Sequence, residues 1–318
     1  MRPVLRPRRR AGRPGAAGGR GAGRGAAAAG PSVVGLLVGP ETAVCEEDLA
    51  ALPDLRIVAV TSTGVDHVPL AAARWRGIWV TSSAGYCTEE VADHTLALAV
   101  GLLRAVTALD RRVRAGHWDV GALRPRRVAG TRWGLVGFGR IARAVAARAH
   151  ALAMVTASWD PSVPDGLFAG AGTRRAADLA GLLAGSDVVS VHLPLTAATR
   201  GLLGVAELAT MPAGSYLVNV ARGELVDVAA LDAALRSGRL AGAALDVLPV
   251  EPPPPGDPAL SLPRTVLTPH AAWYSERALA LAYEWAAATI ADVLAGRRPE
   301  RVVVEPAATA AGQLPGMT

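Results

Sequence analysis

Residues 133–160 read WGLVGFGRIARAVAARAHALAMVTASWD, and the fold can be inferred outward from this stretch. A short apolar run ending at Val136 predicts a strand, and the glycine-rich turn 137–142 follows it at once. Small apolar residues at helical spacing then lead to a second predicted strand, 154–159, which ends in Asp160. This order of strand, turn, helix, strand and aspartate predicts a dinucleotide-binding unit.

Each part of the turn has a physical role in that reading. Gly137 permits the tight turn, Gly139 lets the main chain approach a pyrophosphate, and Ala142 lets the helix lie close to the strand. The pyrophosphate is expected on the free N–H groups at the helix N-terminus, which begins with Arg140 and Ile141. Asp160, 18 residues after Ala142, is placed to accept hydrogen bonds from the ribose hydroxyls.

Composition indicates an α/β enzyme with two domains. The chain has 318 residues, of which 51 % are hydrophobic and only 4 % aromatic, with much of the apolar content supplied by Ala and Gly. No apolar run reaches the ~18 residues of a membrane span, so we expect a soluble protein without a membrane partner. Two cysteines without metal spacing are typical of free thiols in a reducing cytoplasm, and we expect no metal site.

The basic charge is concentrated at the N-terminus. Residues 1–30 hold eight arginines and no acid, so the remaining chain carries −2 although the whole sequence carries +6. An Arg/Gly/Ala/Pro tail cannot bury enough apolar surface to order itself, and we expect it to be disordered. It is either a solvated extension or a weak phosphate- or nucleic-acid-binding arm; the solvated extension is favoured, so we expect no nucleic-acid partner.

The rest of the chain alternates between predicted strands and helices, which is typical of parallel sheets with crossover helices. Three strands precede the long helix 89–106, in which His94 is interpreted as a packing or interface residue. The segment 111–132 is predicted to be irregular. Predicted strands then run 135–136, 155–159, 187–193, 216–220, 243–247 and 265–268, and a last helix spans 276–295.

Two doubly wound domains follow from this pattern. A Rossmann domain is expected over 104–275, and a smaller domain over 31–103, completed by the returning C-terminal segment 276–305. Residues 306–318 are expected to fray.

Polar residues gather where the predicted parallel strands end, which is where ligands bind in such sheets. Arg222 offers a fork of donors for a carboxylate, His270 can exchange a proton near neutral pH, and Glu251 could keep that imidazole protonated. Taken singly, each has a simpler interpretation: Arg222 as a loop arginine paired with Glu224, Glu251 as a solvated acid, and His270 as a cap. Together, at successive strand ends, they favour catalysis.

Several longer runs resemble one known family. VVSVHLPLT (188–196), MPAGSYLVNVARGELVD (211–227) and ALDVLPVEP (244–252) resemble signatures of the D-isomer-specific 2-hydroxyacid dehydrogenases. TSTGVD (61–66) and GYCTEEVADHTLAL (85–98) fit the first domain of the same family, and the likeness covers about residues 33–297. It implies a flavodoxin-like substrate domain beside the Rossmann domain.

The resemblance implies a reaction and a site. An NAD-dependent enzyme would interconvert a D-2-hydroxy acid and its 2-keto acid, with Arg222 on the substrate carboxylate and Glu251 and His270 as proton relay. Ser62, Thr63 and Gly64 would complete carboxylate recognition, and Asp246 would hold the nicotinamide carboxamide. Further expected cofactor contacts are Thr63, Leu193, Pro194, Val220, Ala221, His270 and Ala271. Asp160, with no arginine directly after it, favours NAD over NADP.

The segment TPHAAWYSE (268–276) resembles the C-terminal binding protein branch, where a tryptophan three residues after the histidine lines the substrate pocket. Trp273 matches it, with packing between domains as the other interpretation. This branch leaves open an NAD(H)-sensing, corepressor-like binding module with little turnover. The family also implies a homodimer.

Overall fold

The structure is a computed structural model that describes residues 32–306, so the predictions for the tail 1–30 and for residues 307–318 lie outside it. The chain forms two compact units. Within the described residues, the smaller unit comprises 32–84 and 282–306, and the larger unit comprises Gly85–Leu281. Each unit is an α/β structure built on one sheet, as the sequence predicts.

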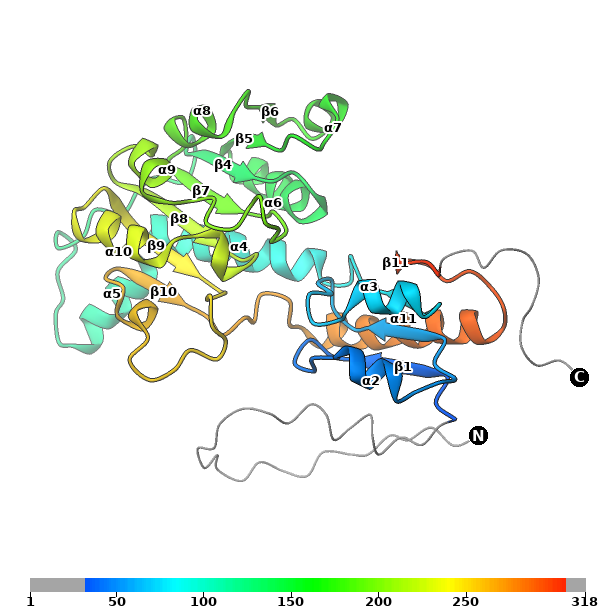
Figure 1. Ribbon diagram of the computed structural model, residues 1–318. Helices are drawn as coiled ribbons and strands as arrows, with labels where there is room; N and C mark the ends of the chain where they lie inside the picture. The colour runs from blue at the N-terminus through cyan, green and yellow to red at the C-terminus, as the bar shows by residue number, and fades with distance from the viewer. Residues whose placement is uncertain (1–31, 307–318) are drawn as a thin grey trace, which may run out of the picture. The chain divides into compact units, whose positions relative to one another are not determined.

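The smaller unit has a four-stranded sheet in the order β1-β2-β3-β11. The strands are β1 (Gly35–Val38), β2 (Ile57–Val60), β3 (Trp79–Thr81) and β11 (Val302–Val304). The first three are parallel, whereas β11 pairs antiparallel with β3 (Figure 1). The predicted parallel sheet is present in β1, β2 and β3, and β11 adds an antiparallel edge strand that the sequence did not predict.

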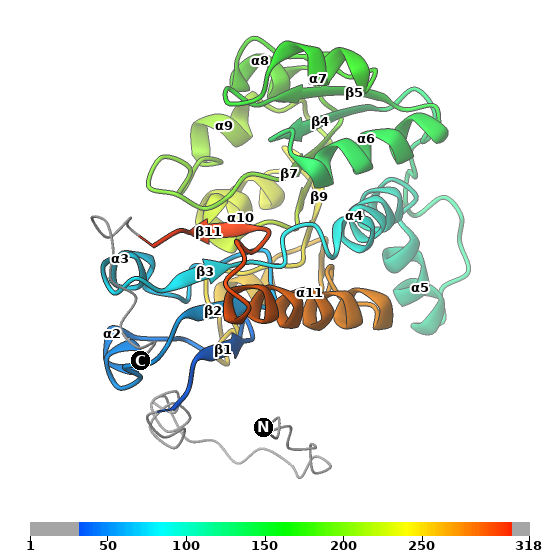
Figure 2. The same cartoon turned by 90° about the vertical axis from the view of Figure 1, so that its right-hand side faces the viewer.

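Alternating residues of β2 face two different layers. Val58 and Val60 belong to the core beneath α2 (Glu46–Ala50) and α3 (Leu70–Trp75). Ile57 and Ala59 pack instead with the apolar face of α11 (Glu276–Leu294). All four β2 residues are buried, as expected for a parallel strand covered on both sides. Figure 2 shows α11 on one side of this sheet and α2 and α3 on the other.

The larger unit has a seven-stranded sheet in the order β10-β9-β8-β7-β4-β5-β6, and all its strands are parallel. Its strands are β4 (Arg132–Val136), β5 (Val155–Trp159), β6 (Arg174–Arg175), β7 (Val188–Val191), β8 (Ser215–Asn219), β9 (Leu240–Leu245) and β10 (Thr265–Leu267). The order reverses between β4 and β7, which is the topological switch point of a doubly wound sheet. The six predicted strands are present, and the two-residue β6 adds a seventh.

Helices cover this sheet (Figure 1). They are α4 (Thr88–Leu103), α5 (Val106–Arg114), α6 (Arg140–Ala151), α7 (Asp165–Gly170), α8 (Leu179–Ala184), α9 (Val205–Thr210) and α10 (Val228–Arg236), with 3₁₀ turns Gly223–Leu225 and Pro258–Ser261. α4 packs against α6, while α8, α9 and α10 lie together over the main apolar core. Among the described residues no single helix could cross a membrane, although α4 and α5, bent by 60°, meet the length and composition together.

Two predictions need correction. The irregular segment predicted over 111–132 is wrong at its start, because residues 111–114 belong to helix α5, which an Asp110–Arg114 ion pair one helical turn apart supports. The larger unit also begins at Gly85 and not after residue 103, because α4 packs on α6 and on the sheet of the larger unit. The second boundary falls inside α11, at residue 281, and not at residue 275.

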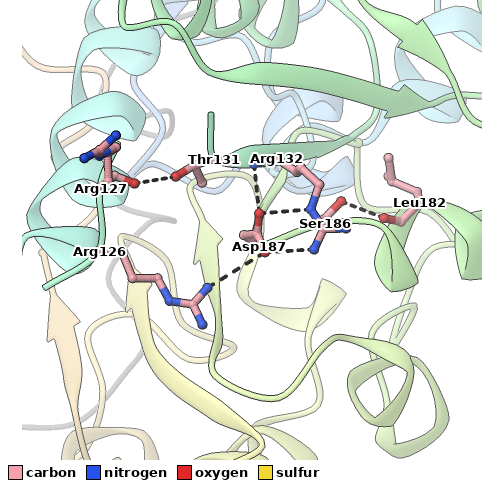
Figure 3. A network of polar contacts seen from close by, with 7 residues as sticks. All are labelled: Arg126, Arg127, Thr131, Arg132, Leu182, Ser186 and Asp187. Carbon is pink, nitrogen blue, oxygen red and sulfur yellow. Dashed lines mark hydrogen bonds and ion pairs between the residues drawn. The ribbon is translucent and has the colours of Figure 1, made fainter. Parts of the chain in front are cut away.

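An ion pair between Arg132 and Asp187 links the starts of β4 and β7 (Figure 3). Asp187 accepts from the Arg132 main-chain N–H at 3.0 Å, from its Nε at 3.0 Å and from its Nη2 at 2.9 Å. Arg126 lies 3.8 Å from the same carboxylate. The hydrogen bonds from Arg132 hold the pKa of Asp187 below its usual range, even though partial burial acts in the other direction. This cluster lies at the amino edge of the sheet, opposite the strand ends predicted to bind ligands.

Candidate active site

The predicted site residues of the larger unit lie at one edge of its sheet. Because all seven strands are parallel, their carboxyl ends meet there. Gly137 follows β4, Asp160 follows β5 and Asp246 follows β9. The same edge carries Leu193 and Pro194 after β7, Val220, Ala221 and Arg222 after β8, and His270 and Ala271 after β10.

Gly137 is required by the backbone of the turn. Its φ of +95° lies in the region that favours glycine. A Cβ there would lie 3.0 Å from the carbonyl carbon and oxygen of His192 and 3.0 Å from Cδ2 of Leu193. The turn is thus pressed against the end of β7, and Gly137 N–H donates to the Trp159 carbonyl at 2.9 Å.

Gly139 differs, because a Cβ added to it would meet no protein atom within 4 Å. It is the N-cap of α6, and no side chain caps the helix, whose first residues are Arg140 and Ile141. Ala142 is fully buried, so the helix lies close to the sheet as predicted. Open space beside a glycine and a helix N-terminus with no side-chain cap fit the pyrophosphate of a dinucleotide.

Asp160 is held in place by the turn that it faces. Its Oδ2 accepts from Phe138 N–H at 2.8 Å, and its Oδ1 accepts from Ser162 N–H at 2.9 Å. Each oxygen keeps a lone pair that could accept from a ribose hydroxyl. Arg175 also lies close, 3.4 Å from the Asp160 carbonyl oxygen, and is paired with Asp165. Arg175 does not directly follow Asp160 in the sequence, because β6 brings it in from 15 residues further along the chain.

The loop that carries Arg222 is fixed from within. Asn219 is 1 % exposed; its amide donates to the Arg222 carbonyl at 2.9 Å, and its oxygen accepts from Ala221 N–H at 3.1 Å. Gly223 lets this loop touch the next one, since a Cβ there would lie 2.0 Å from the Leu248 carbonyl carbon. Neither residue stood out in the sequence. Glu224, the alternative partner considered for Arg222, lies 3.6 Å from Arg200.

Glu251 and His270 form a direct pair. Glu251 Oε2 lies 2.6 Å from His270 Nδ1, and its Oε1 accepts from Leu248 N–H at 2.8 Å. Partial burial acts to raise the pKa of Glu251, but the His270 hydrogen bond, the Leu248 N–H and the charges of His270 and Arg222 together lower it. The contact involves Nδ1, so Nε2 of the same ring is left to face a substrate.

The backbone at His270 is in the left-handed region, with φ of 51°. Asp246 surrounds this turn with contacts: its carbonyl accepts from His270 N–H at 2.7 Å, and its carboxylate accepts from Ala271 and Ala272 N–H, each at 2.9 Å. The Asp246 side chain has no exposed surface. These contacts make Asp246 an anchor of the turn, and its predicted contact with a nicotinamide carboxamide stays a prediction.

Trp273 packs among aromatic rings of its own unit. Its ring centroid lies 6.2 Å from that of Tyr86 and 5.4 Å from that of Tyr274, which meets it edge to face. Burial raises the pKa of Tyr86, so its phenol stays neutral. The indole is half-exposed, and its two ring contacts, which lie within the larger unit, test neither the predicted pocket role nor packing between the domains.

His192 directly follows β7 and lies beside Gly137. Its Nε2 lies 2.7 Å from Ser190 Oγ, which in turn accepts from Trp133 Nε1 at 2.9 Å. Burial lowers the pKa of His192 to about 3, and the ring is therefore neutral at physiological pH.

In the smaller unit, the predicted substrate loop 62–64 follows β2. Ser62 is 9 % exposed, and its hydroxyl donates to the Gly64 carbonyl at 2.7 Å. Its own carbonyl accepts from Ser83 N–H at 3.0 Å. Thr63 is exposed and Gly64 partly exposed. The loop is therefore braced by Ser62 while the next two residues reach its surface.

Comparison with known proteins points to one family. The family model for the NAD-binding domain of D-isomer specific 2-hydroxyacid dehydrogenases matches residues 96–272. A glycerate dehydrogenase of Methylorubrum extorquens is 35 % identical over 81 % of this chain and 81 % of its own. A glyoxylate reductase of Korarchaeum cryptofilum is 39 % identical over 86 % and 82 %. The structure of a D-lactate dehydrogenase from Aquifex aeolicus with NAD and lactic acid superposes with a TM-score of 0.79, at 28 % identity over 87 % and 88 %.

Proposed function

The chain belongs to the D-isomer-specific 2-hydroxyacid dehydrogenase family, and we propose that Arg222, Glu251 and His270 carry its reaction. It is an NAD-dependent oxidoreductase that interconverts a D-2-hydroxy acid and its 2-keto acid. None of the relatives described above is a corepressor, and the alternative of a binding module without turnover has no support among them. The C-terminal binding protein branch remains only a resemblance of residues 268–276.

The 2.6 Å contact between His270 Nδ1 and Glu251 Oε2 is the observation that carries the proposal. When bound, NAD supplies the hydride acceptor for oxidation and, in its reduced form, the hydride donor. In keto-acid reduction, His270 gives the proton on Nε2 to the carbonyl oxygen and regains one from solvent. The ionised Glu251 stabilises the imidazolium before the transfer and orients the ring.

Arg222 is the carboxylate anchor in this proposal. Its loop is fixed through Asn219 and is pressed against Leu248, three residues before Glu251, through Gly223. A planar guanidinium at such a fixed loop can hold a carboxylate by two hydrogen bonds and polarise the adjacent carbonyl. Main-chain N–H groups of residues 62–64 complete carboxylate recognition, and Trp273 contributes an apolar wall to the substrate pocket.

For the cofactor, we propose that residues 137–142 hold the pyrophosphate and that Asp160 accepts from the adenosine ribose. A 2′-phosphate beside Asp160 would meet like charge, so NADH is preferred over NADPH. The remaining contacts are those expected from the sequence: Thr63, Leu193, Pro194, Val220, Ala221, Asp246, His270 and Ala271.

Oxidation of NADH against a panel of small 2-keto acids tests the function. We expect turnover with at least one of them, a strong preference for NADH, and loss of about 10³-fold in kcat in His270→Gln. Arg222→Gln should mainly raise KM for the keto acid. Tight NADH binding without turnover on any keto acid would refute the catalytic proposal, and equal use of NADPH would refute the role of Asp160.

We further propose a homodimer in the cytoplasm. The proposed contact surface comprises α5 and the segment 115–120 that follows it. No residue of α5 is buried in the single chain. Val113 of α5 is 48 % exposed, and the neighbouring Trp118 and Val120 are 89 % and 95 % exposed. Exposed apolar side chains so close together are typical of a protein interface.

A further inference from the structure

His94 is linked to the turn that carries His270 by hydrogen bonds that pass through the side chains of Thr268 and Asp246. It lies on α4, and its Nε2 is 3.1 Å from Thr268 Oγ1 and 3.6 Å from Asp246 Oδ1. Thr268 Oγ1 in turn lies 2.6 Å from Asp246 Oδ1. An ionised carboxylate can only accept, so the Thr268 hydroxyl donates a hydrogen bond to Asp246. The same hydroxyl oxygen then accepts a hydrogen bond from the Nε2–H of His94. The direction of both hydrogen bonds is therefore set.

Asp246 passes this constraint on to the turn. Its carboxylate accepts from Ala271 and Ala272 N–H, and its carbonyl accepts from His270 N–H at 2.7 Å. His270 has a φ of 51°, a conformation that non-glycine residues keep only where surrounding contacts enforce it. The ring position of His270 therefore depends on how firmly Asp246 is held.

We propose that His94 is a positioning residue for His270, acting through Thr268 and Asp246. The proposal rests on the catalytic role of His270 proposed above. By donating to Thr268, His94 keeps the threonine hydroxyl directed at Asp246, and the buried carboxylate then keeps its full set of donors. His94 touches neither reacting atoms nor the Glu251–His270 pair, so its effect on turnover is indirect.

The surroundings of His94 argue against a simple packing role. Its side chain is 26 % exposed, at a surface hollow of about 310 Å³ that solvent can enter. The hollow is lined by Glu90, Asp93, His94, Ala97, Ala271, Ala272 and Tyr274. The neighbouring acids have other partners, since Glu90 accepts from Ser275 and Asp93 pairs with Arg148. His94 is thus tied to the interior by Nε2, while the hollow lies beside it.

A double-mutant cycle tests the route. We expect His94→Ala to lower kcat for keto-acid reduction about tenfold, because Asp246 and the turn that carries His270 are then held less firmly. Thr268→Val should cause a similar loss, and the double variant should lose no more than either single variant. His94→Gln, which retains an N–H donor near the position of Nε2, should recover most of the activity.

His150→Ala is the matched control, because His150 Nε2 lies 2.7 Å from the hydroxyl of Thr156 in the same unit but far along the chain from the His270 turn. It should change the unfolding midpoint without changing kcat. Additive losses for His94→Ala and Thr268→Val, an unchanged kcat in His94→Ala, or an equal loss in His150→Ala would each overturn the proposal. Wild-type turnover and the loss in His270→Gln are measured first, so failure of the proposed function is recognised separately.

Discussion

At the scale of single residues, Glu251 and His270 come from two different loops and form one hydrogen-bonded pair. His270 is bound through Nδ1, and the pKa of Glu251 stays below its usual range because His270, Leu248 N–H and the charge of Arg222 outweigh its partial burial. The carboxylate therefore remains charged from neutral pH down to mildly acidic pH. Its charge, and not only its shape, is what the imidazolium requires.

Glu251→Gln removes that charge and leaves a side chain of the same size. We expect kcat for keto-acid reduction to fall about 100-fold. The reason is that a neutral amide no longer stabilises positive charge on the ring. The kcat at saturating NADH and keto acid measures this. A variant kcat equal to that of the wild type would show that Glu251 only packs against the ring.

At the scale of the elements, the turn between β4 and α6 contains two glycines, Gly137 and Gly139, that are needed for different reasons. Gly137 is needed by the protein itself, because of its positive φ and the nearby carbonyl of His192. Gly139 has ordinary backbone angles and open space around its Cβ position. Its requirement can therefore come only from a ligand that approaches the main chain.

Gly139→Ala should leave the unfolding midpoint nearly unchanged and weaken NADH binding at least tenfold, because the added methyl would occupy the approach of the pyrophosphate. Fluorescence titration with NADH measures the affinity directly. Gly166→Ala is the control, since its Cβ in α7 also meets nothing within 4 Å and should change neither property. Wild-type affinity in Gly139→Ala would place the pyrophosphate elsewhere.

At the amino edge of the same sheet, we expect the contacts between Asp187 and Arg132 to stabilise the fold. Asp187→Asn should lower the free energy of unfolding by about 1–2 kcal/mol at pH 7, because charge-assisted hydrogen bonds from Arg132 to a partly buried carboxylate are lost. Since its folded pKa is lowered, Asp187 contributes this stability above the ordinary carboxyl range and loses it as the pH falls through the folded value.

Urea unfolding at pH 7 and pH 3 should therefore show a difference between wild type and Asp187→Asn that shrinks in acid. Asp110→Asn provides the comparison, because its ion pair with Arg114 is exposed on one helix and should contribute much less stability than the Asp187 contacts. An undiminished difference at pH 3 would mean that the charge of Asp187 is not what stabilises the edge.

At the scale of the whole molecule, the exposed apolar side chains of Val113, Trp118 and Val120 support the proposed contact with a second copy of the chain. Trp118→Asp should convert the proposed dimer to a monomer, because a buried charge at an apolar interface is costly. Size-exclusion chromatography with light scattering measures the mass of both proteins. Trp75→Asp, at an 85 % exposed position in the smaller unit, is the control and should keep the wild-type mass. A monomeric wild type would rule out the homodimer.

Much of the larger unit could be predicted from sequence because parallel strands carry a local signal. A buried strand is a short apolar run, and the residue after it lies at the ligand edge, so Asp160, Asp246 and His270 could be placed before any coordinates. The antiparallel strand β11 and the helix α5 were missed. A three-valine strand and a short charged helix gain their stability from neighbours, which local periodicity does not report.

By itself, the sequence determined the order of elements, the dinucleotide turn and the identities of the residues at the strand ends. These follow from backbone requirements and hydrophobic periodicity, which are local properties. Only the tertiary structure decided that Glu251 reaches Nδ1 of His270, that Gly223 presses one loop on another, and that His94 reaches Asp246 through Thr268. Those contacts join residues far apart in the chain, and their distances depend on how the strands and α4 pack together.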